Sequence, residues 1–473
     1  IVYHTYRENV MKIRRFLSVF FALLVSFTSV WTPCASAAET EEGSQEDAIP
    51  EISVEAKAAL LIDPTTDEIL YEQNIHEPLY PASITKVMTS LLVLEAIDAG
   101  QLTMDQVLTA SATAVDLPYD ASTANLKEGE QMTVEQLLHC ILVVSAADAC
   151  NVLAEAVSGS IDAFVAQMNQ RAQELGCVDT HFANPHGYHD DQHYTTAWDI
   201  YLFTKAAREY ETFNTIVATG RFEIPATNLS DSRVYYTTNY LLNGYRNADY
   251  VYSAANGIKT GNTSNAGYCL VASAAKNGRS LLSVVLGAER VELETGGYRV
   301  MSFYETIRLF DWGFDNFTRR TILQTAEPVA ELDVALSSVD HITVQPAYEV
   351  ERLLPNNLTA DDLHRETTFY HKVVDAPIAE GDVLGEITLS YGDTVYATVP
   401  LLASNDVEAS RLLVFRRNAL DFLSRKSVRI GAIVLVILVV LVVLWLRSPL
   451  RRNRRYGKVT HGSANRRYRG RRH

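Results

Sequence analysis

The most informative stretch of this sequence is Asn256-Gly257-Ile258-Lys259-Thr260-Gly261-Asn262-Thr263. An apolar run with β character, residues 266–272, follows it. We therefore expect Lys259 and Thr260 on an edge strand, where Gly261 permits a close approach of the backbone. A lysine and a hydroxyl in this setting suit the binding of a substrate that ends in a carboxylate.

A second motif, Ser83-Ile84-Thr85-Lys86, lies far upstream and supplies a candidate nucleophile. Serine is a poor nucleophile unless a base takes its proton. Pro81 is expected to open a helix, so Lys86 lies on the same helical face as Ser83 and within reach of its hydroxyl. To act as the base, Lys86 must be neutral, which requires burial and a nearby positive charge such as Lys259.

The spacing Ser-x-x-Lys is weak evidence by itself, because Ser273-Ala274-Ala275-Lys276 repeats it. That segment has a β pattern, in which positions i and i+3 face opposite sides of the strand. Ser273 and Lys276 are therefore predicted to be a strand residue and a turn lysine. For Ser83 and Lys86 an ordinary helix start is the alternative, but the Lys-Thr-Gly strand favours the catalytic interpretation.

The beginning of the chain has the pattern of a targeting segment. Residues 11–38 are predicted to be a secretory signal peptide, with a basic start, an apolar run and a small-residue cleavage site at 35–38. An uncleaved membrane anchor is the alternative. Residues 1–10 are interpreted as an upstream extension of the reading frame, with Met11 as the start, and residues 39–52 as a flexible spacer.

Residues 430–446 form an uninterrupted apolar run of 17 residues, at the short limit for a transmembrane helix. Arg429 and Arg447 bracket this run. The tail 447–473 carries eleven Lys and Arg residues and no acid, so the positive-inside rule places it in the cytoplasm. Nucleic-acid binding by the tail is an alternative explanation of its charge.

The formal charge of −16 hides a division of the chain. The tail contributes +11 and residues 1–38 contribute +3, which leaves −30 for residues 39–446. The strongly negative charge of residues 39–446 argues against nucleic-acid binding and is compatible with an extracytoplasmic protein.

Four cysteines follow the predicted signal peptide: Cys140, Cys150, Cys177 and Cys269. An even number outside the cell permits disulfides, but the spacings define no framework. All four lie in apolar surroundings, so free buried thiols are the preferred interpretation.

Local patterns predict a catalytic domain over residues 53–320. Its expected elements are a strand–turn–strand unit at 58–71, a helix after Pro81, a helical stretch at 134–157 broken near 145–148, a hairpin around Asn277-Gly278, and a helix at 301–314.

Residues 321–410 show short strands and turn residues, and they are predicted to form a small all-β domain. Within it, residues 383–389 and 394–402 are expected to pair as a hairpin. Residues 411–429 are expected to be a helical connector between this domain and the transmembrane helix.

Several motifs together resemble those of the low-molecular-mass D-alanyl-D-alanine carboxypeptidases, which are serine peptidases among the penicillin-binding proteins. These motifs are Pro81-Ala82-Ser83-Ile84-Thr85-Lys86, Asn184-Pro185-His186-Gly187, Gly257-Ile258-Lys259-Thr260-Gly261 and residues 266–274. The resemblance covers residues 58–314 and continues weakly into the β domain at 379–385 and 399–401.

The resemblance implies an α/β (α+β) fold of the penicillin-binding and β-lactamase-like serine transpeptidase type. In this fold an antiparallel sheet packs with helices. The small all-β domain and the C-terminal transmembrane helix then follow along the chain.

The resemblance also implies a role for each matching residue. Ser83 would attack the carbonyl of the penultimate D-Ala and form an acyl-enzyme, with Lys86 as the general base. Ser145 would relay a proton to the leaving D-Ala. The terminal carboxylate would be held by Lys259, Thr260 and Gly261.

The backbone N–H groups of Ser83 and Asn262 would form the oxyanion hole. Water would then hydrolyse the acyl-enzyme, and β-lactams would acylate Ser83 as substrate mimics. No cofactor is implied. His186 and His193 do not indicate a metal site, because no further ligand lies at a suitable spacing.

Two positions depart from the family pattern. The family's Ser-x-Asn motif is Ser145-Ala146-Ala147 here, so Ala147 replaces an asparagine whose amide would bind the substrate backbone. Asn151 lies one helical turn away and is not expected to substitute. The residue after Lys-Thr-Gly is Asn262 where the family often has histidine, and a backbone oxyanion donor survives that change.

The leading hypothesis is a membrane-anchored D-Ala-D-Ala carboxypeptidase that trims peptidoglycan stem pentapeptides, with its catalytic domain outside the membrane. A β-lactamase or a DD-endopeptidase would use the same nucleophile, but the sequence has no Glu-x-x-Leu-Asn for the deacylating water of a class A β-lactamase. The other alternative, suggested by Ala147, is a catalytically weakened penicillin-binding wall protein.

Overall fold

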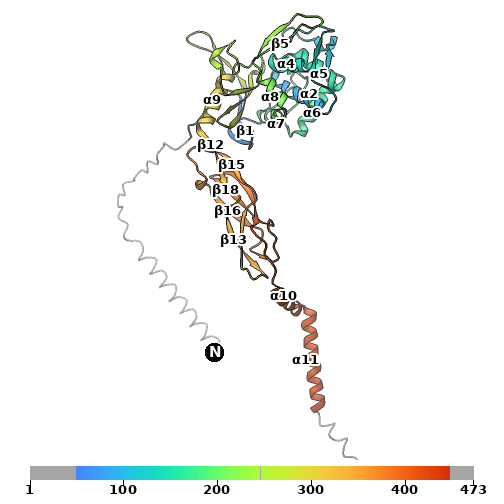
Figure 1. Ribbon diagram of the computed structural model, residues 1–473, viewed down its shortest axis with the longest axis vertical. Helices are drawn as coiled ribbons and strands as arrows, with labels where there is room; N and C mark the ends of the chain where they lie inside the picture. Colours follow the sequence, from blue (N-terminus) through green and yellow to red (C-terminus); the bar gives the residue numbers. More distant parts are fainter. Residues whose placement is uncertain (1–48, 246, 448–473) are drawn as a thin grey trace, which may run out of the picture. The chain divides into compact units, whose positions relative to one another are not determined.

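The computed structural model describes residues 49–245 and 247–447 of the chain. The predicted signal peptide, most of the predicted spacer and the tail beyond Arg447 lie outside the described residues. The described residues belong to one compact unit. Along the chain, a region of mixed helices and strands comes first, a β region follows, and two helices end the described part (Figure 1).

The first region is built on a five-stranded antiparallel sheet with the order β2-β1-β9-β8-β7. Its strands are β1 (Ala58–Asp63), β2 (Glu68–Gln73), β7 (Ala255–Thr263), β8 (Gly267–Lys276) and β9 (Arg279–Ala288). Because β1 pairs with β9, the first and last strands of this sheet in chain order are neighbours in space. β7 lies at the edge of the sheet, as the sequence predicts for the Lys-Thr-Gly strand.

The predicted hairpin around Asn277-Gly278 is confirmed. Lys276 pairs directly with Arg279, so the turn contains two residues. Asn277 and Gly278 have φ values of 54° and 75°. Positive φ at both central residues is the type I′ geometry, which matches the twist of the flanking strands and favours Asn-Gly. The predicted strand–turn–strand unit at 58–71 is likewise confirmed as β1 and β2.

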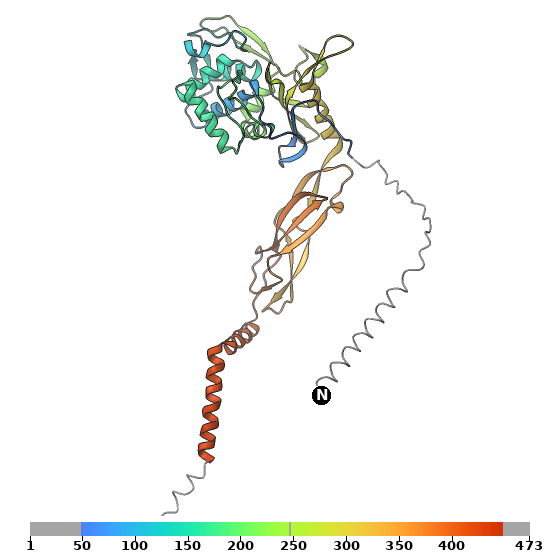
Figure 2. The same cartoon turned by 180° about the vertical axis from the view of Figure 1, so that it is seen from behind.

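Side chains alternate along each strand, so every strand presents residues to both faces of the sheet. Both faces are buried. Leu60 and Ile62 of β1 pack into the core shared with the main group of helices. Ala59 and Leu61 face the other way, into a core that contains Phe310 of α9 (Met301–Asn316). Figure 1 shows α9 on one side of this region and the labelled α2 and α4–α8 on the other, and Figure 2 shows the same region from behind.

The main group of helices consists of α2 (Lys86–Asp98), α4 (Val134–Val143), α5 (Ala147–Ser158), α6 (Ile161–Glu174), α7 (Ala197–Arg208) and α8 (Glu211–Val217). A capping box at Thr133 begins α4. α4 ends at Val143 and α5 begins at Ala147, which confirms the predicted break near residues 145–148. The helix after Pro81 differs from expectation, since it begins as the 3-10 helix η1 (Ala82–Thr85) before α2 starts.

Shorter elements surround this core. They are β3 (Val107–Thr109), α3 (Ala112–Val115), β4 (Gln131–Thr133), β5 (Arg221–Ile224), β6 (Arg233–Tyr236), η2 (Ala248–Tyr250), β10 (Arg290–Glu292) and β11 (Tyr298–Val300).

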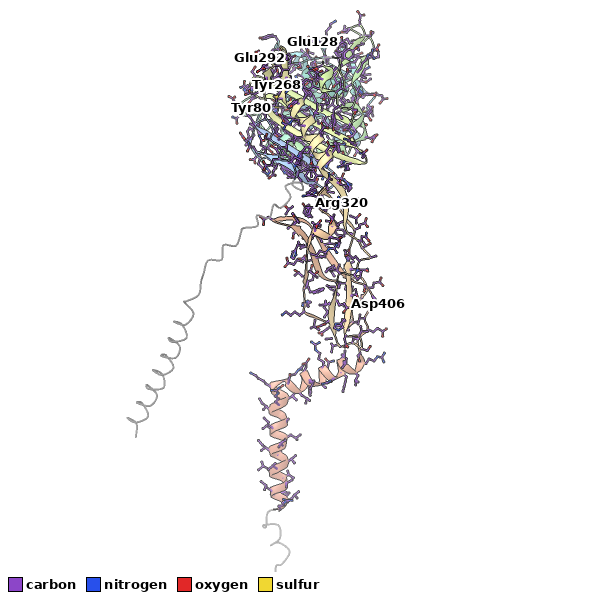
Figure 3. The ribbon with its side chains drawn as sticks, turned by 90° about the vertical axis from the view of Figure 1, so that its left-hand side faces the viewer. Tyr80, Glu128, Tyr268, Glu292, Arg320 and Asp406 are labelled. Carbon is purple, nitrogen blue, oxygen red and sulfur yellow. The ribbon has the colours of Figure 1, made fainter. Side chains whose placement is uncertain are left out.

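The β region has its own apolar core. It contains β12 (Phe317–Leu323), β13 (Ala330–Ala335), β14 (His341–Pro346), β15 (Val350–Pro355), η3 (Ala360–Asp362), β16 (His364–Phe369), β17 (Val373–Asp375), β18 (Val383–Tyr391) and β19 (Thr394–Ala403). Six strands form a sheet in the order β16-β18-β19-β14-β13-β17, and β12 pairs with β15. The predicted hairpin of residues 383–389 and 394–402 is confirmed as β18 and β19. In Figure 3 the labelled Arg320 and Asp406 mark β12 and the segment after β19.

Two helices end the described chain: α10 (Arg411–Ser424) and α11 (Lys426–Arg447). The connector predicted as a helix over 411–429 is therefore interrupted at Arg425, whose ψ of 131° is not helical. α11 has the length and composition of a membrane-spanning helix, and its large apolar side chains are exposed (Figure 3). The four cysteines of the described residues are buried and free, as predicted.

Candidate active site

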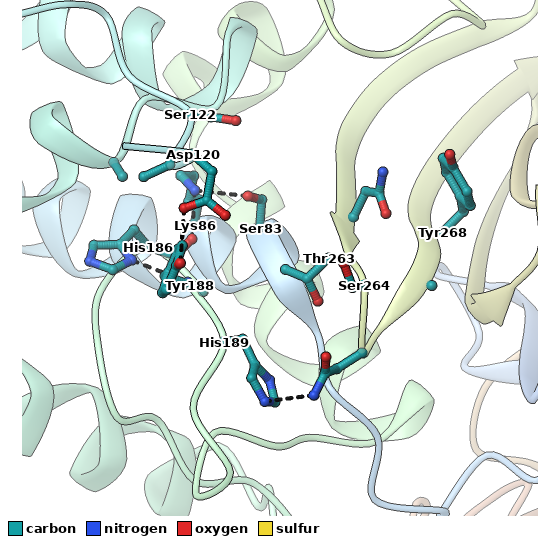
Figure 4. Close-up of a pocket in the computed structure, with 16 residues that line it drawn as sticks. Ser83, Lys86, Asp120, Ser122, His186, Tyr188, His189, Thr263, Ser264 and Tyr268 are labelled. Atoms are coloured by element: carbon teal, nitrogen blue, oxygen red, sulfur yellow. Dashed lines mark hydrogen bonds between the residues drawn. The ribbon is translucent and has the colours of Figure 1, made fainter. Parts of the chain in front are cut away.

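Ser83 and Lys86 meet where η1 passes into α2. Lys86 Nζ donates a hydrogen bond to Ser83 Oγ at 2.9 Å and another to the backbone oxygen of His186 at 2.5 Å (Figure 4). In a 3-10 turn, side chains three residues apart eclipse each other. The local helix type therefore brings the serine and the lysine of Ser-x-x-Lys into contact.

The competing pair, Ser273 and Lys276, does not meet. Ser273 Oγ donates to Asn256 Oδ1 at 2.5 Å. Lys276 ends β8 and lies 3.8 Å from Asp315 in an exposed ion pair. The prediction that strand geometry separates these two side chains is confirmed.

The turn that carries Ser83 is held from behind by the Asn184-Pro185-His186-Gly187 segment. Gly187 has a φ of 78°, and a Cβ at this position would lie 1.8 Å from the backbone oxygen of Ala82. Only glycine fits there. Thr85 Oγ1 donates to that same Ala82 oxygen at 2.8 Å, and it lies 2.7 Å from His193 Nε2.

His186 of this segment and His193, a few residues further on, contribute to the fold of the site. His193 Nδ1 accepts the backbone N–H of Ala183, so its Nε2 carries the proton toward Thr85. Burial lowers the pKa of His186 and of His193 to about 3, so both rings are neutral. Among the described residues, no three histidine, cysteine or acidic side chains are grouped so that they could hold a metal ion.

Lys86 and Lys259 are two buried amines in one site. Burial lowers the pKa of Lys86 to about 8, although Cys150 and Asp148 act in the opposite direction. Burial also lowers the pKa of Lys259 well below its usual value, and the positive charge of Lys86 adds to this effect. A neutral lysine beside Ser83 is the form that can take a proton.

Lys259 lies beneath the site surface. Its side chain is 1% exposed, and Nζ donates to the backbone oxygen of Thr260 at 2.9 Å. The hydroxyl of Thr260 lies 2.7 Å from that of Thr238. Thr238 and Thr260 line a cavity, whereas the side chain of Lys259 does not.

Ser145 lies in the short link between α4 and α5. Its φ of 67° is left-handed, which is uncommon and costly for a residue with a side chain. Its Oγ is buried and has no hydrogen-bond partner among the described residues. An unpartnered buried hydroxyl beside the nucleophile is available to a bound molecule.

Two adjoining cavities of about 630 and 320 Å³ share Ser83, Ser122, Asn262 and Tyr268 in their walls. The larger one also contains Lys86, Asp120, Ala147, His186 and Tyr188 (Figure 4), and the smaller one contains Ser145, Thr238, Thr260, Gly261 and Arg290. Gly261 packs closely against the nucleophile turn, since a Cβ there would lie 2.6 Å from the backbone oxygen of Pro81. Every predicted site residue except Lys259 therefore borders one of the two cavities.

Ala147 lines the larger cavity, so the position expected to carry an asparagine does face the site. Asn151 does not replace that amide, because its Nδ2 donates to the backbone oxygen of Ala114 at 3.1 Å. Asp148, the next residue, accepts the backbone N–H groups of Ala124 and Leu126, both at 2.9 Å. It thereby fixes the loop of residues 116–126 over the cavity.

Sequence reasoning missed several side chains that line these cavities, among them the four polar or charged residues Asp120, Ser122, Tyr188 and Arg290. Asp120 and Tyr188 are 68 residues apart, yet Tyr188 Oη donates to Asp120 Oδ1 at 2.9 Å. Arg290 is the charged side chain of the smaller cavity, and its guanidinium lies 4.8 Å from the ring centre of Tyr298. None of the four stands in a motif, so spacing alone gave no signal for them.

Comparison with known proteins gives a consistent result for most of the chain. The family described as D-alanyl-D-alanine carboxypeptidase matches residues 42–290, and the family described as penicillin-binding protein 5, C-terminal domain, matches residues 317–409. The D-alanyl-D-alanine carboxypeptidase DacF of Bacillus subtilis is 31% identical over 371 residues, which cover 78% of this chain and 90% of that protein. DacC of Escherichia coli is 29% identical over 389 residues, covering 81% and 90%.

Solved structures agree with these matches. Penicillin-binding protein 5 from Haemophilus influenzae is 28% identical with a TM-score of 0.62, covering 76% of this chain and 100% of that one. The D-alanyl-D-alanine carboxypeptidase DacD from Francisella tularensis is 26% identical with a TM-score of 0.62, covering 80% and 100%. The predicted fold class, a penicillin-binding-type region followed by an all-β region, is thus confirmed.

Proposed function

The chain belongs to the family of serine-type D-alanyl-D-alanine carboxypeptidases, and on this premise we propose how its residues release the terminal D-Ala of a peptidoglycan stem pentapeptide. The observation that carries the proposal is the 2.9 Å contact between Ser83 Oγ and the buried Nζ of Lys86. Neutral Lys86 takes the hydroxyl proton while Ser83 Oγ attacks the carbonyl carbon of the penultimate D-Ala.

The backbone N–H groups of Ser83 and Asn262 stabilise the oxyanion that forms, since both residues border both cavities. The proton held by Lys86 passes through Ser145 Oγ to the nitrogen of the leaving D-Ala, and the C–N bond breaks. A water molecule then attacks the acyl-enzyme and regenerates Ser83 Oγ–H.

The terminal carboxylate of the substrate occupies the smaller cavity. Thr238 and Thr260 offer hydroxyl groups there, and Arg290 offers a planar guanidinium that matches a carboxylate with two parallel hydrogen bonds. We assign Lys259 a supporting role from beneath, because its Nζ is directed to the backbone oxygen of Thr260.

β-Lactams acylate the same serine in this proposal. No glutamate lines either cavity within the described part of the chain. A class A β-lactamase relies on a glutamate for fast hydrolysis of the acyl-enzyme, so we expect a long-lived penicilloyl adduct rather than turnover.

Ala147 favours one second candidate, a penicillin-binding wall protein with weakened catalysis. Labelling with a fluorescent penicillin, together with a D-Ala release assay, separates the two functions. A carboxypeptidase gives both signals, and Ser83→Ala abolishes both. A weakened protein gives the label without D-Ala release.

We further propose that α11 spans the cell membrane once, with the catalytic region outside and the basic tail in the cytoplasm. The length of α11, its exposed apolar surface and the charge of the tail support this orientation. Protease added to intact spheroplasts should remove the catalytic region and leave an epitope at the C-terminus protected. Loss of the epitope with retention of the catalytic region would reverse the orientation.

A further inference from the structure

The larger cavity extends from the nucleophile toward the N-terminal side of a bound peptide. β7 is an edge strand, so an extended peptide can pair with its free edge. A peptide that runs antiparallel to β7 with its carboxylate at Thr260 places its upstream residues beside Thr263 and Ser264. Thr260 borders the smaller cavity, whereas Thr263 and Ser264 border the larger one. The larger cavity therefore receives the residues that precede the D-Ala pair.

Asp120 is the acidic side chain in the wall of this larger cavity. Its Oδ1 accepts the hydrogen bond from Tyr188 Oη, and Figure 4 shows these two side chains meeting at the cavity. A carboxylate can accept about four hydrogen bonds in all. Asp120 is exposed, and neither an ion-pair partner nor a second hydrogen bond to its side chain occurs among the described residues.

The cations near this wall do not neutralise Asp120. Lys86 borders the same cavity, but it is buried and is directed to Ser83 Oγ and to the backbone oxygen of His186. His189 borders the cavity too, and its Nε2 contacts Asn265 at 2.8 Å and Asp191 at 3.4 Å. The upstream part of the cavity thus presents one negative charge that no described side chain balances.

We propose that Asp120 determines specificity by binding the side-chain ammonium of the stem-peptide residue that precedes the D-Ala pair. This inference rests on the proposed carboxypeptidase function and adds a specificity-determining residue to the same site. An acylated amine carries no charge, so a stem peptide whose amine is already cross-linked loses the contact. The enzyme accordingly favours stems that are not yet cross-linked.

The test compares two pentapeptides that differ only in an acetyl group on one side-chain amine. The third residue is L-lysine in one peptide and Nε-acetyl-L-lysine in the other. kcat/KM for D-Ala release is measured for the full-length wild-type enzyme, for Asp120→Asn and for Asp116→Asn, at low and high salt. Asp116→Asn is the matched control, because Asp116 is exposed on the same loop and borders neither cavity.

We expect the wild type and Asp116→Asn to prefer the free amine by about 1.5- to fivefold, the range of an exposed ion pair, and this preference to shrink at high salt. Asp120→Asn should lose the preference, because its rate falls more on the free-amine peptide than on the acetylated one. Retention of the preference in Asp120→Asn, or its absence from the wild type, would overturn the proposal. Absence of D-Ala release from both peptides would instead overturn the carboxypeptidase function, and the specificity proposal with it.

Discussion

Lys86 is the residue whose ionisation controls the site. Its amine is completely buried, and burial lowers its pKa to about 8, whereas a lysine in water stays charged up to about pH 10.4. In the proposed mechanism the neutral form is the base, so acylation requires Nζ to be unprotonated when Ser83 attacks. The positive charge of Lys86 in turn helps burial to lower the pKa of Lys259.

The pH dependence follows from this assignment. As the pH rises toward 8, the neutral fraction of Lys86 grows, so the second-order rate of acylation by penicillin should rise about tenfold per pH unit and level off above pH 8. Stopped-flow measurement of acylation between pH 5.5 and about 9.5 checks the profile. A rate that is constant over this range, or that falls as the pH rises, would contradict Lys86 as the base.

Ala147 gives a second prediction at the scale of one residue. Ala147→Asn adds an amide to the wall of the larger cavity, where it can bind both Lys86 and the substrate backbone. Acylation should accelerate about two- to tenfold, which corresponds to one hydrogen bond of about 0.5–1.5 kcal/mol. Ala147→Leu is the control, since it adds volume without an amide and should bring no gain. An equal rate in Ala147→Asn and the wild type would show that other groups already supply this contact.

Sequence reasoning reached Ser83, Lys86 and Ser145 because each stands in a short motif at a fixed spacing. It did not reach Asp120 or Tyr188, since their contact joins two loops whose meeting is set by packing. Its expectation that Lys259 holds the substrate carboxylate stays a prediction, and the structure adds that this side chain is buried with its Nζ donating to the backbone oxygen of Thr260. Periodicity locates a residue on a strand, but the depth of its terminal atom depends on the neighbouring elements.

At the scale of elements, the α4–α5 break organises the site. Ser145 lies in this break and has a left-handed backbone conformation. In the first turn of α5, Ala147 lines the larger cavity and Asp148 accepts a hydrogen bond from the loop of residues 116–126. Arg233 of β6 donates to the backbone oxygen of Ala124 in the same loop at 3.1 Å, and it also pairs with buried Glu130 at 2.6 Å. The loop that carries Asp120 is thus anchored at several points.

Asp148→Ala should loosen this loop. The backbone N–H groups of Ala124 and Leu126 lose their acceptor in a buried setting, at about 1–3 kcal/mol each. We expect the melting temperature of the catalytic region to fall by about 5–12 °C, with slower acylation. Differential scanning calorimetry measures the first effect, and Asp116→Asn on the same loop serves as a control that leaves the transition in place. An unchanged melting temperature would show that Asp148 does not hold the loop.

Elements were predictable where their signal is local. Asn277-Gly278 dictates a two-residue turn, and the small and polar residues at 145–148 interrupt a helix. The 3-10 start of the Ser83 helix was not predictable, because Ala82 of this turn packs against Gly187, which belongs to a loop distant in the sequence. The amino-acid composition around Arg425 also gives no indication that the helix is interrupted there.

At the scale of the whole molecule, the two folded regions and the proposed membrane anchor occupy separate parts of the sequence. The apolar cores of the two folded regions contain no residue of α10 or α11. α11 instead exposes a continuous apolar surface, which is stable when lipid covers it. The acidic body and the basic tail lie on opposite ends of that helix in the sequence.

Truncation tests this separation. A chain that stops at Ser410 should be soluble without detergent, and its kcat/KM on a small peptide should stay within about twofold of the full-length enzyme, since no core is cut. The full-length protein should remain in the membrane pellet after alkaline carbonate extraction. A truncated protein that still sediments with membranes would place the anchor elsewhere.

The most direct test of the central claim is D-Ala release from a defined stem pentapeptide, measured alongside mass spectrometry of the penicillin-treated protein. The account predicts catalytic release by the wild type, a penicilloyl adduct on the peptide that contains Ser83, and the loss of both in Ser83→Ala. D-Ala release that persists in Ser83→Ala, or an adduct on a different serine, would contradict it.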